Sequence, residues 1–455
     1  MAIQSKNPTT EKILKSFNEI SNEELEKKLS KASFAFQSWK KTSFQERSVL
    51  VHKLGDYLQS HAEEFSRLQM MEMGKTMKSG PLGIEKCGIL CDYYADNAET
   101  ILSIEILHTE KKEQYVRFDP LGIILGVMPW NFPYWQVYRY AIPAIMAGNV
   151  CVLKHASNVP QCAESVEESF RAVGFPEGVF QNLLLSSSRV ENLIRDSRIM
   201  AVSLTGSEKT GSEVVRVSGE EIKKVVLELG GSDPFIVFAD ANIVEAAKMA
   251  VLARLQGNTG QSCIAAKRFI VEESIKEDFL KIVVEEFSKL SVGDPSNKDI
   301  DIGPLATEQI LLEVEKQVEH SVVLGAKVIY GGKRKEGKGY FYLPTVITNV
   351  KKGMPVYDEE VFGPILSVIS FKHEEESIKI ANDTKYGLGA SIFTSDMKKA
   401  KRIIPLIEAG NVCVNDIVKS DVRAPFGGIK HSGYGRELSS YGIKEFVNIK
   451  NVWIK

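Results

Sequence analysis

The stretch IILGVMPWNFP, residues 123–133, indicates the fold class. Its first six residues are almost all large and apolar, which is typical of a strand buried on both faces of a parallel sheet. Similar runs follow, and amphipathic segments such as 160–173 lie between them. Strand, helix and strand at this spacing predict βαβ units and an open, doubly wound α/β sheet. The other runs are residues 150–153, 180–185, 200–204 and 224–229.

The residues that precede this stretch are predicted to be helical. Ser21 with Glu24, and Ser43 with Glu46, have the spacing of capping boxes. We expect the helices of the first hundred residues to cover the sheet.

A second α/β unit is predicted after Asp233. A helix is expected over residues 242–255, and the junction between the two units falls near Gly230 and Gly231. Active sites are often built in clefts between domains. The strand-like runs of the second unit are residues 234–238, 268–271, 365–371, 390–393 and 412–414.

Composition excludes several classes of protein. The 455 residues exceed the usual size of one hydrophobic core, so two large domains are expected. With 57 Lys and Arg against 59 Asp and Glu, nucleic acid and anionic membranes are not expected partners. No run reaches about 18 apolar residues, and six cysteines do not make a disulfide framework. The sequence predicts a soluble, cytoplasmic protein.

Cys263 is the candidate nucleophile. It lies in a small, polar segment, GQSC (260–263), whereas a packing thiol usually lies among larger apolar residues. The alternative is that Cys263 is a structural thiol. Cys87 and Cys91 lie in a helical pattern without a nearby histidine, so they are expected to pack in a core. No metal site is expected.

Glu228 and Asn131 are candidate partners of this thiol. Glu228 ends an apolar run and precedes two glycines, which would let backbone approach a carboxylate at a cleft edge. It could equally be a surface acid at a strand end. Asn131 could donate a hydrogen bond to an oxyanion, or it could cap the helix that Pro133 is expected to begin.

Residues 205–211, with the sequence TGSEKTG, could bind phosphate. They follow a strand and open a helix, whose first amides could hold a pyrophosphate, although any βα turn can contain two glycines. Lys154 follows the run 150–153. It could reach a coenzyme hydroxyl or be a solvated lysine at a strand end.

The chain resembles the NAD(P)-dependent aldehyde dehydrogenases from about residue 7 to its carboxyl terminus. The resemblance implies a Rossmann-type coenzyme domain, an α/β catalytic domain and a small oligomerisation β-extension. It also implies that Cys263 attacks the aldehyde, that Asn131 stabilises the oxyanion, and that Glu228 activates water to hydrolyse a thioester. The matching blocks are PWNFP (129–133), VLK (152–154), LTGS (204–207), ELGG (228–231), GQSC (260–263), EVFGP (360–364) and PFGG (425–428).

The same resemblance implies the coenzyme site. Many NAD-specific relatives have Glu at the position of Ser157, where a carboxylate would repel a 2′-phosphate. With Ser157 there and Lys154 nearby, we expect NADP to be preferred over NAD. The implied coenzyme-binding residues are Trp130, Lys154, Ser157, Thr205, Gly206, Ser207, Leu229, Glu360 and Phe362.

The resemblance within the family is to bacterial succinate-semialdehyde dehydrogenases, so the expected substrate is a small aldehyde with a distal carboxylate. Another small or anionic aldehyde is the alternative. Arg139, Ser420 and Arg423 are the expected carboxylate partners, and Phe426 with Trp130 is expected to line the aldehyde tunnel. A second arginine found in many such enzymes is replaced by Gly257. Arg254 could compensate for it or face solvent.

Three other functions remain open at this stage. A CoA-acylating enzyme would generally lack Glu228, and a silent coenzyme-binding or assembly protein would not need the thiol, acid and amide. A cysteine hydrolase would need a histidine near Cys263, but only His155 lies in a motif.

The resemblance also divides the chain. Residues 1–107 and 119–230 are the expected coenzyme domain, and 231–431 the catalytic domain. Residues 108–118 and 432–455 are the expected oligomerisation segments, through which family members form homodimers or homotetramers. The alternation in 447–454 predicts a half-buried strand.

Overall fold

The computed structural model describes residues 3–108, 110 and 113–455. Its first sheet has five parallel strands, as the apolar runs predict. The second strand is two residues longer than predicted, so Lys154 lies within it, and the edge strand ends three residues earlier. In spatial order the strands are β7 (Phe180–Asn182), β6 (Val150–His155), β5 (Ile123–Met128), β8 (Ile199–Thr205) and β9 (Lys224–Glu228).

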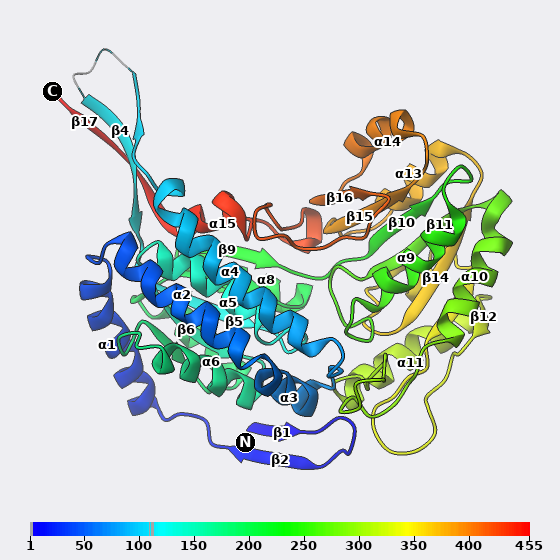
Figure 1. The fold of residues 1–455 in the computed structure, drawn as a ribbon, viewed down its shortest axis with the longest axis horizontal. Coiled ribbons are helices and arrows are strands. Elements are labelled where there is room, and N and C mark those ends of the chain that lie inside the picture. The colour runs from blue at the N-terminus through cyan, green and yellow to red at the C-terminus, as the bar shows by residue number, and fades with distance from the viewer. Residues whose placement is uncertain (1–2, 109, 111–112) are drawn as a thin grey trace.

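Helices of the first half of the chain pack around this sheet, as Figure 1 shows in blue to green. Both capping boxes are confirmed, because each serine and its glutamate exchange hydrogen bonds at a helix start. The helices are α1 (Asn22–Trp39), α2 (Phe44–Ser60), α3 (Ala62–Met73), α4 (Gly80–Ile101), α5 (Trp135–Met146), α6 (Pro160–Ala172), α7 (Val190–Arg195) and α8 (Glu208–Glu220).

The second sheet has seven strands, and all its pairs are parallel except β12 with β13. The strands predicted downstream of Asp233 are confirmed within one or two residues. Strands β12 and β13 are not among the predicted strands, and each is only four residues long, on either side of a glycine-rich loop. In spatial order the sheet contains β12 (Lys327–Tyr330), β13 (Thr345–Thr348), β14 (Ile365–Phe371), β11 (Ala266–Glu272), β10 (Asp233–Val237), β15 (Gly389–Phe393) and β16 (Asn411–Val414).

Residues 229–232 connect β9 of the first sheet to β10 of the second, where the sequence placed the junction. The two sheets and their helices form the left and right parts of Figure 1. The exact domain boundaries stay a prediction. The helices of the second part and the C-terminal region are α9 (Ile243–Leu255), α10 (Lys276–Ser288), α11 (Glu308–Val323), α12 (Pro355–Asp358), α13 (Glu374–Asn382), α14 (Met397–Ile403) and α15 (Ser439–Lys444).

An N-terminal hairpin corrects the expectation that the first hundred residues are helical. Strands β1 (Ile3–Lys6) and β2 (Ile13–Phe17) pair antiparallel. The hairpin had no clear apolar signal because the first four residues of β2 are exposed. Its turn reaches the second part of the molecule, where Tyr340 N–H donates to Pro8 O at 3.0 Å and Gly339 N–H donates to Glu11 Oε1 at 2.8 Å.

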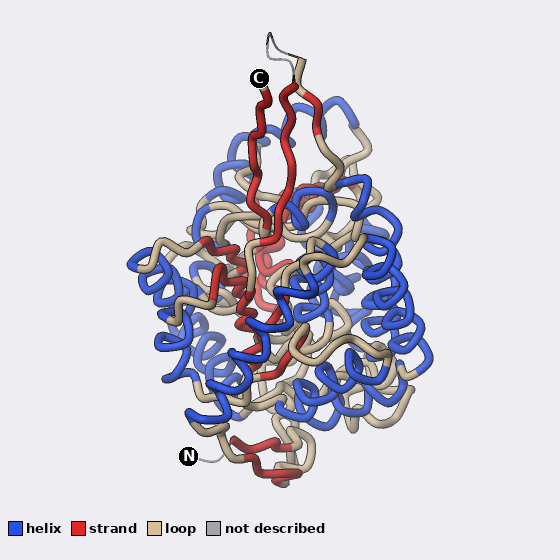
Figure 2. Tube along the Cα trace, turned by 90° about the vertical axis from the view of Figure 1, so that its left-hand side faces the viewer, coloured by secondary structure: helices blue, strands red, loops and turns tan. Residues whose placement is uncertain are grey.

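A three-stranded ribbon projects from the body, as Figure 2 shows at the top. It contains β3 (Glu105–Ile106), β4 (Glu113–Pro120) and β17 (Val447–Ile454), in the order β17-β4-β3. The strand prediction for 447–454 is confirmed, but the strand is mostly exposed rather than half-buried, because it extends beyond the body. Of the predicted segment 108–118, residues 109, 111 and 112 lie outside the described residues. Among the described helices, none is both long and apolar enough to cross a membrane.

Candidate active site

Cys263 lies between two pockets. One, of about 280 Å³, is lined by residues from the ends of β5, β8 and β9 and by Glu360 and Phe362. The other, of about 270 Å³, lies towards α4 and α5 and is lined by Lys75, Lys86 and Phe426. Cys263 and Gln136 line both pockets. A group on this sulfur can therefore be reached from two sides.

The loop that carries Cys263 is held by buried cations. Arg254, at the end of α9, is fully buried and donates to Ala266 O at 2.8 Å, Gly260 O at 2.7 Å and Val361 O at 3.1 Å. It neither faces solvent nor lines the pockets beside Cys263, and so differs from both sequence-based interpretations. Gly260 has φ +76° and its missing Cβ would overlap Gly363 O, so the loop also requires glycine there.

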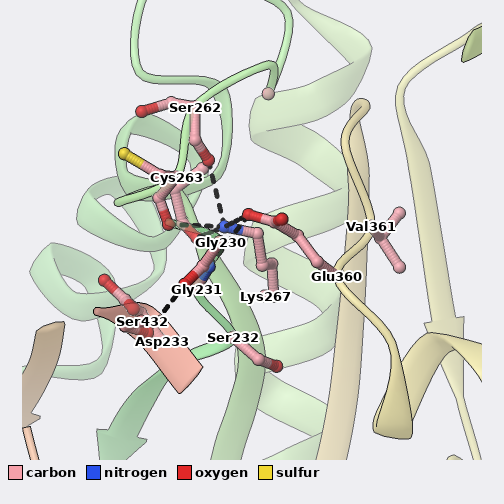
Figure 3. Close-up of polar contacts among 12 residues, drawn as sticks. Gly230, Gly231, Ser232, Asp233, Ser262, Cys263, Lys267, Glu360, Val361 and Ser432 are labelled. Atoms are coloured by element: carbon pink, nitrogen blue, oxygen red, sulfur yellow. Dashed lines mark hydrogen bonds and ion pairs between the residues drawn. The ribbon is translucent and has the colours of Figure 1, made fainter. Parts of the chain in front are cut away.

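Lys267 binds the other side of the same loop. Its Nζ donates to Ser262 O at 3.0 Å, Cys263 O at 2.7 Å and Ala265 O at 3.0 Å. It also lies 3.4 Å from Glu360 Oε1, as Figure 3 shows. Because these contacts fix the carbonyls on either side of the thiol, the backbone that presents Cys263 is preorganised.

The environment of the Cys263 thiol disfavours its ionised form. Burial raises its pKa to about 12, although the charges of Arg139 and Lys267 oppose that rise. A nucleophilic role would require a base, because the thiolate is the reactive form. Among the described residues the Cys263 backbone N–H has no hydrogen-bond acceptor, so it is available to an oxyanion.

Glu228 is the candidate base of the site. It ends β9 opposite Thr205 of β8, is 1% exposed, and has no hydrogen-bond partner for either carboxylate oxygen in the described structure. Burial raises the pKa of this carboxyl group. Gly427 leaves room for it, because a Cβ at that position would lie 2.7 Å from Glu228 Oε1. Glu228 is therefore a buried acid and not a surface acid at a strand end.

A second buried carboxylate, Glu437, lies near Glu228 and further raises the pKa of Glu228. Its Oε2 pairs with Arg139 Nε at 2.5 Å, and both side chains are 3% exposed. Arg139 Nη2 also donates to Thr205 Oγ1 at 3.3 Å, and the guanidinium lies 5.0 Å from the centre of the Phe426 ring. The charge of Arg139 is thus already matched by a carboxylate of the protein.

Asn131 joins the PWNFP segment to the thiol loop. It is 4% exposed; its Nδ2 donates to Gln261 O at 3.1 Å, and its Oδ1 accepts from Gln136 Nε2 at 3.1 Å. Asn258 Nδ2 donates back to Asn131 O at 2.8 Å. Asn131 does not cap a helix, because α5 begins only at Trp135 and has no side-chain cap. The second hydrogen of its amide remains for a group bound at Cys263.

A groove of about 590 Å³ runs from the Cys263 side along the ends of β5, β6 and β8. Ser207 caps α8 by accepting from Thr210 N–H at 3.3 Å, so the first turn of this helix faces the groove. Lys154 lines it too, and burial lowers its pKa. Ser157 is exposed, one residue beyond the lining residue Ala156.

Most of the expected coenzyme-binding residues line this groove or the adjoining pocket of about 280 Å³ beside Cys263. Trp130, Thr205, Gly206 and Ser207 line both the groove and the adjoining pocket. Leu229, Glu360 and Phe362 line the pocket only, and the Trp130 and Phe362 rings meet edge to face with centres 5.8 Å apart. Glu360 Oε1 accepts from Gly231 N–H at 3.0 Å. A helix N-terminus, a buried lysine that forms no ion pair with a described residue, and flanking aromatic rings fit a dinucleotide.

Comparison with known proteins agrees with this geometry. The aldehyde dehydrogenase family model matches residues 1–452. The chain belongs to the aldehyde dehydrogenase family. It is 47% identical to a probable NADP(+) succinate-semialdehyde dehydrogenase of Synechocystis and 48% identical to an NADP(+) succinate-semialdehyde dehydrogenase of Mycobacterium tuberculosis, with each pair covered over its full length.

Solved structures give the same family. The succinic semialdehyde dehydrogenase of Streptococcus pyogenes, in complex with NADP+, is 36% identical and superposes with a TM-score of 0.97 over the whole of both chains. The protein Gox0499 is 38% identical with a TM-score of 0.98, again over both whole chains. The predicted fold class, with its Rossmann-type sheet and second α/β unit, is thereby confirmed.

In this aldehyde dehydrogenase, three of the four expected substrate residues line one pocket and the fourth does not. Arg139, Ser420 and Phe426 line the pocket on the α4 side of Cys263. Arg423 is not among its lining residues; its side chain is 77% exposed and makes two hydrogen bonds to Asp421. Trp130 lines the coenzyme-side cavities and not this pocket, so it does not share a wall with Phe426.

Several residues of the site have no local sequence signal that would predict them. Lys75 lies in the loop between α3 and α4 and Lys86 lies in α4, where a lysine usually faces solvent, and Glu437 lies near the C-terminus without a motif signal. Their burial results from packing between segments far apart in sequence. Gln136 could have been found from the sequence, because it lies in the first turn of the helix that follows the PWNFP segment.

Proposed function

We propose that this enzyme oxidises succinate semialdehyde to succinate with NADP. The observation that carries the proposal is the position of Cys263, between a groove suited to a dinucleotide and a separate pocket that contains lysines. An aldehyde with a distal carboxylate fits such a pocket. The relatives named as NADP(+) succinate-semialdehyde dehydrogenases support the choice of substrate and coenzyme.

Cys263 would start the reaction. Glu228, the candidate base, would take the proton of the thiol and pass it to solvent, the sulfur would bond to the aldehyde carbon, and the carbonyl oxygen would become an oxyanion. The free hydrogen of the Asn131 amide and the Cys263 N–H would stabilise that charge, and Lys267 would keep the loop rigid while it forms. NADP, when bound, would supply the hydride acceptor for this chemistry.

Glu228 would complete the reaction. Once the bound aldehyde has been oxidised, the acyl group remains on Cys263 as a thioester. Glu228 would take a proton from water, the oxygen of that water would bond to the acyl carbon, and the carbon–sulfur bond would break to release the acid. A carboxylate with a raised pKa and free oxygens is suited to this role.

Lys154 and Ser157 would favour NADP. Lys154 lines the groove and forms no ion pair with a described residue, and Ser157 brings no negative charge to the turn after β6. A 2′-phosphate would gain a cation and meet no repulsion. We also propose that the protein is cytoplasmic, where its six free thiols would stay reduced, and that it forms a homodimer or homotetramer.

The test is a panel of aldehydes with and without a distal carboxylate, each assayed with NADP and NAD. We expect the highest kcat/KM for succinate semialdehyde with NADP, and loss of activity in Cys263→Ser. Equal or better efficiency with NAD would reject the coenzyme preference. Parental activity in Cys263→Ser would reject the mechanism.

A further inference from the structure

The pocket on the α4 side of Cys263 is lined by four cations, and two of them are already paired. Arg139 pairs with Glu437 inside the protein, and Lys419 pairs with Asp416 at 2.9 Å near the surface. Lys75 and Lys86 also line the pocket, and neither forms an ion pair with any described residue. These two lysines are the cations of the pocket that form no direct ion pair with a described residue; the charge of Asp421 acts on Lys86 only from beyond ion-pair distance, and Asp421 itself pairs with Arg423.

Lys86 is the more firmly positioned of the two. It projects from α4, and its Nζ donates to Ser420 Oγ at 2.7 Å. The ammonium also lies 4.4 Å from the centre of the Trp135 ring of α5. A hydroxyl and an aromatic face fix the direction of the ammonium but do not neutralise its charge.

Lys75 lies on another wall of the same pocket. It is 5% exposed, and its Nζ lies 4.4 Å from the centre of the Phe132 ring. Burial lowers the pKa of both lysines to about 8. A bound carboxylate would reverse that effect, because an opposite charge favours the charged form of a lysine.

We propose that Lys86, together with the Ser420 hydroxyl, binds the distal carboxylate of the substrate, and that Lys75 adds a second positive charge to the same subsite. This inference rests on the proposed function and deepens it, because it assigns the anion-binding role to lysines in place of Arg139 and Arg423. Those arginines are satisfied by Glu437 and Asp421.

The test compares Lys86→Gln with the parent enzyme on succinate semialdehyde and on butanal, which has the same number of carbons but no carboxylate. Loss of a charged hydrogen bond should raise the KM for succinate semialdehyde about 10-fold or more. The KM for butanal should change less than about 2-fold, because no charge is lost from its binding. Succinate should also become a weaker inhibitor, by a similar factor.

Lys419→Gln is the matched control, because Lys419 lines the same pocket but is 59% exposed and already paired. Its KM values should stay near those of the parent. If Lys86→Gln does not fold, Lys86→Met, which keeps the aliphatic stem, serves for the same comparison. Equal effects of the Lys86 change on both aldehydes, or none on either, would overturn the lysine assignment.

The two proposals fail in different ways. If the parent enzyme itself does not prefer succinate semialdehyde to butanal, the proposed function fails, and the carboxylate subsite fails with it. If the parent enzyme shows the preference and Lys86→Gln retains it, only the lysine assignment fails. Selective loss of the preference in Lys86→Gln supports both.

Discussion

At the scale of single residues, two buried carboxylates and one guanidinium set the charge of the site. Glu228 and Glu437 are both buried and both have raised pKa values, and Arg139 lies near enough to oppose the rise in each. Of these two carboxylates Arg139 pairs directly only with Glu437, and Glu228 has no hydrogen-bond donor in the described structure. With a raised pKa and no hydrogen-bond donor, the carboxylate of Glu228 accepts a proton readily.

Glu437→Gln should therefore move the pH profile of kcat. A base acts in its ionised form, so activity that depends on Glu228 should rise as pH passes upward through its raised pKa. Removing the like charge of Glu437 lowers that pKa, and Arg139 then favours the Glu228 carboxylate more strongly. The rising limb should shift to lower pH.

The measurement is kcat against pH for the parent and for Glu437→Gln. Glu228→Gln provides the comparison, because it should lose the rising limb together with most of the turnover. A rising limb in Glu437→Gln at the same pH as in the parent would show that Glu437 does not influence the base.

How far the residues of the site could be predicted depends on whether they lie in motifs. Cys263, Glu228 and Asn131 stand in short segments at strand ends or turns, where the pattern places them at a cleft. Lys86 and Glu437 lie in helical or C-terminal segments, and their burial depends on contacts with Trp135, Ser420 and Arg139. No local pattern predicts such contacts.

At the scale of elements, β5 and α5 pack closely because of a glycine in the strand. The ring of Tyr140 lies where a Cβ of Gly126 would be, and its hydroxyl donates to Val152 O of β6 at 3.3 Å. Both residues are buried, Gly126 in the central strand of the first sheet and Tyr140 on the helix that packs against it. This contact positions α5, which carries Gln136 and Arg139 to the site.

Gly126→Ala should destabilise the protein by overpacking, by about 1–3 kcal/mol. The measurement is the midpoint of thermal unfolding. Gly219→Ala is the matched control, because nothing lies within 4 Å of its added Cβ in α8, and alanine should favour the helix. An unchanged midpoint in Gly126→Ala would mean that Tyr140 can move aside freely.

The elements of both sheets could be predicted wherever strands are buried on both faces, because such strands are continuous apolar runs. The N-terminal hairpin, β12 and β13 could not be predicted in this way. Strand β2 has only Phe17 buried and β12 is at most half-buried. Strand β13 is buried but short, with only Val346 and Ile347 between two threonines, so none of the three has the long apolar run that marks a buried strand.

At the scale of the whole molecule, the ribbon exposes apolar side chains far from the body. Ile449 and Trp453 of β17 are each 61% exposed, and Ile106 of β3 is 73% exposed. Exposed apolar side chains grouped on one projecting element are typical of an interface. A second copy of the chain is the occupant that we expect.

Replacing both Ile449 and Trp453 with Asp should therefore reduce the oligomeric state. The two carboxylates would lose their hydration on association. The free energy of that desolvation exceeds what burial of the remaining apolar surface contributes. Sedimentation velocity measures the outcome, with Asn448→Asp, an exposed polar position of the same strand, as the control. Unchanged assembly in the double variant would place the interface elsewhere.

The hairpin at the N-terminus and the ribbon at the C-terminus have a consequence for how the chain is made. Pro8 and Glu11 bond to residues near 340, while Asn149 beside β6 donates to Phe446 O at 2.8 Å. A ribosome delivers residues 340 and 446 long after the first sheet has emerged. The first half of the nascent polypeptide therefore cannot form its contacts with residues 339, 340 and 446 until those residues have been synthesised, and the contact with Phe446 forms only near the end of translation.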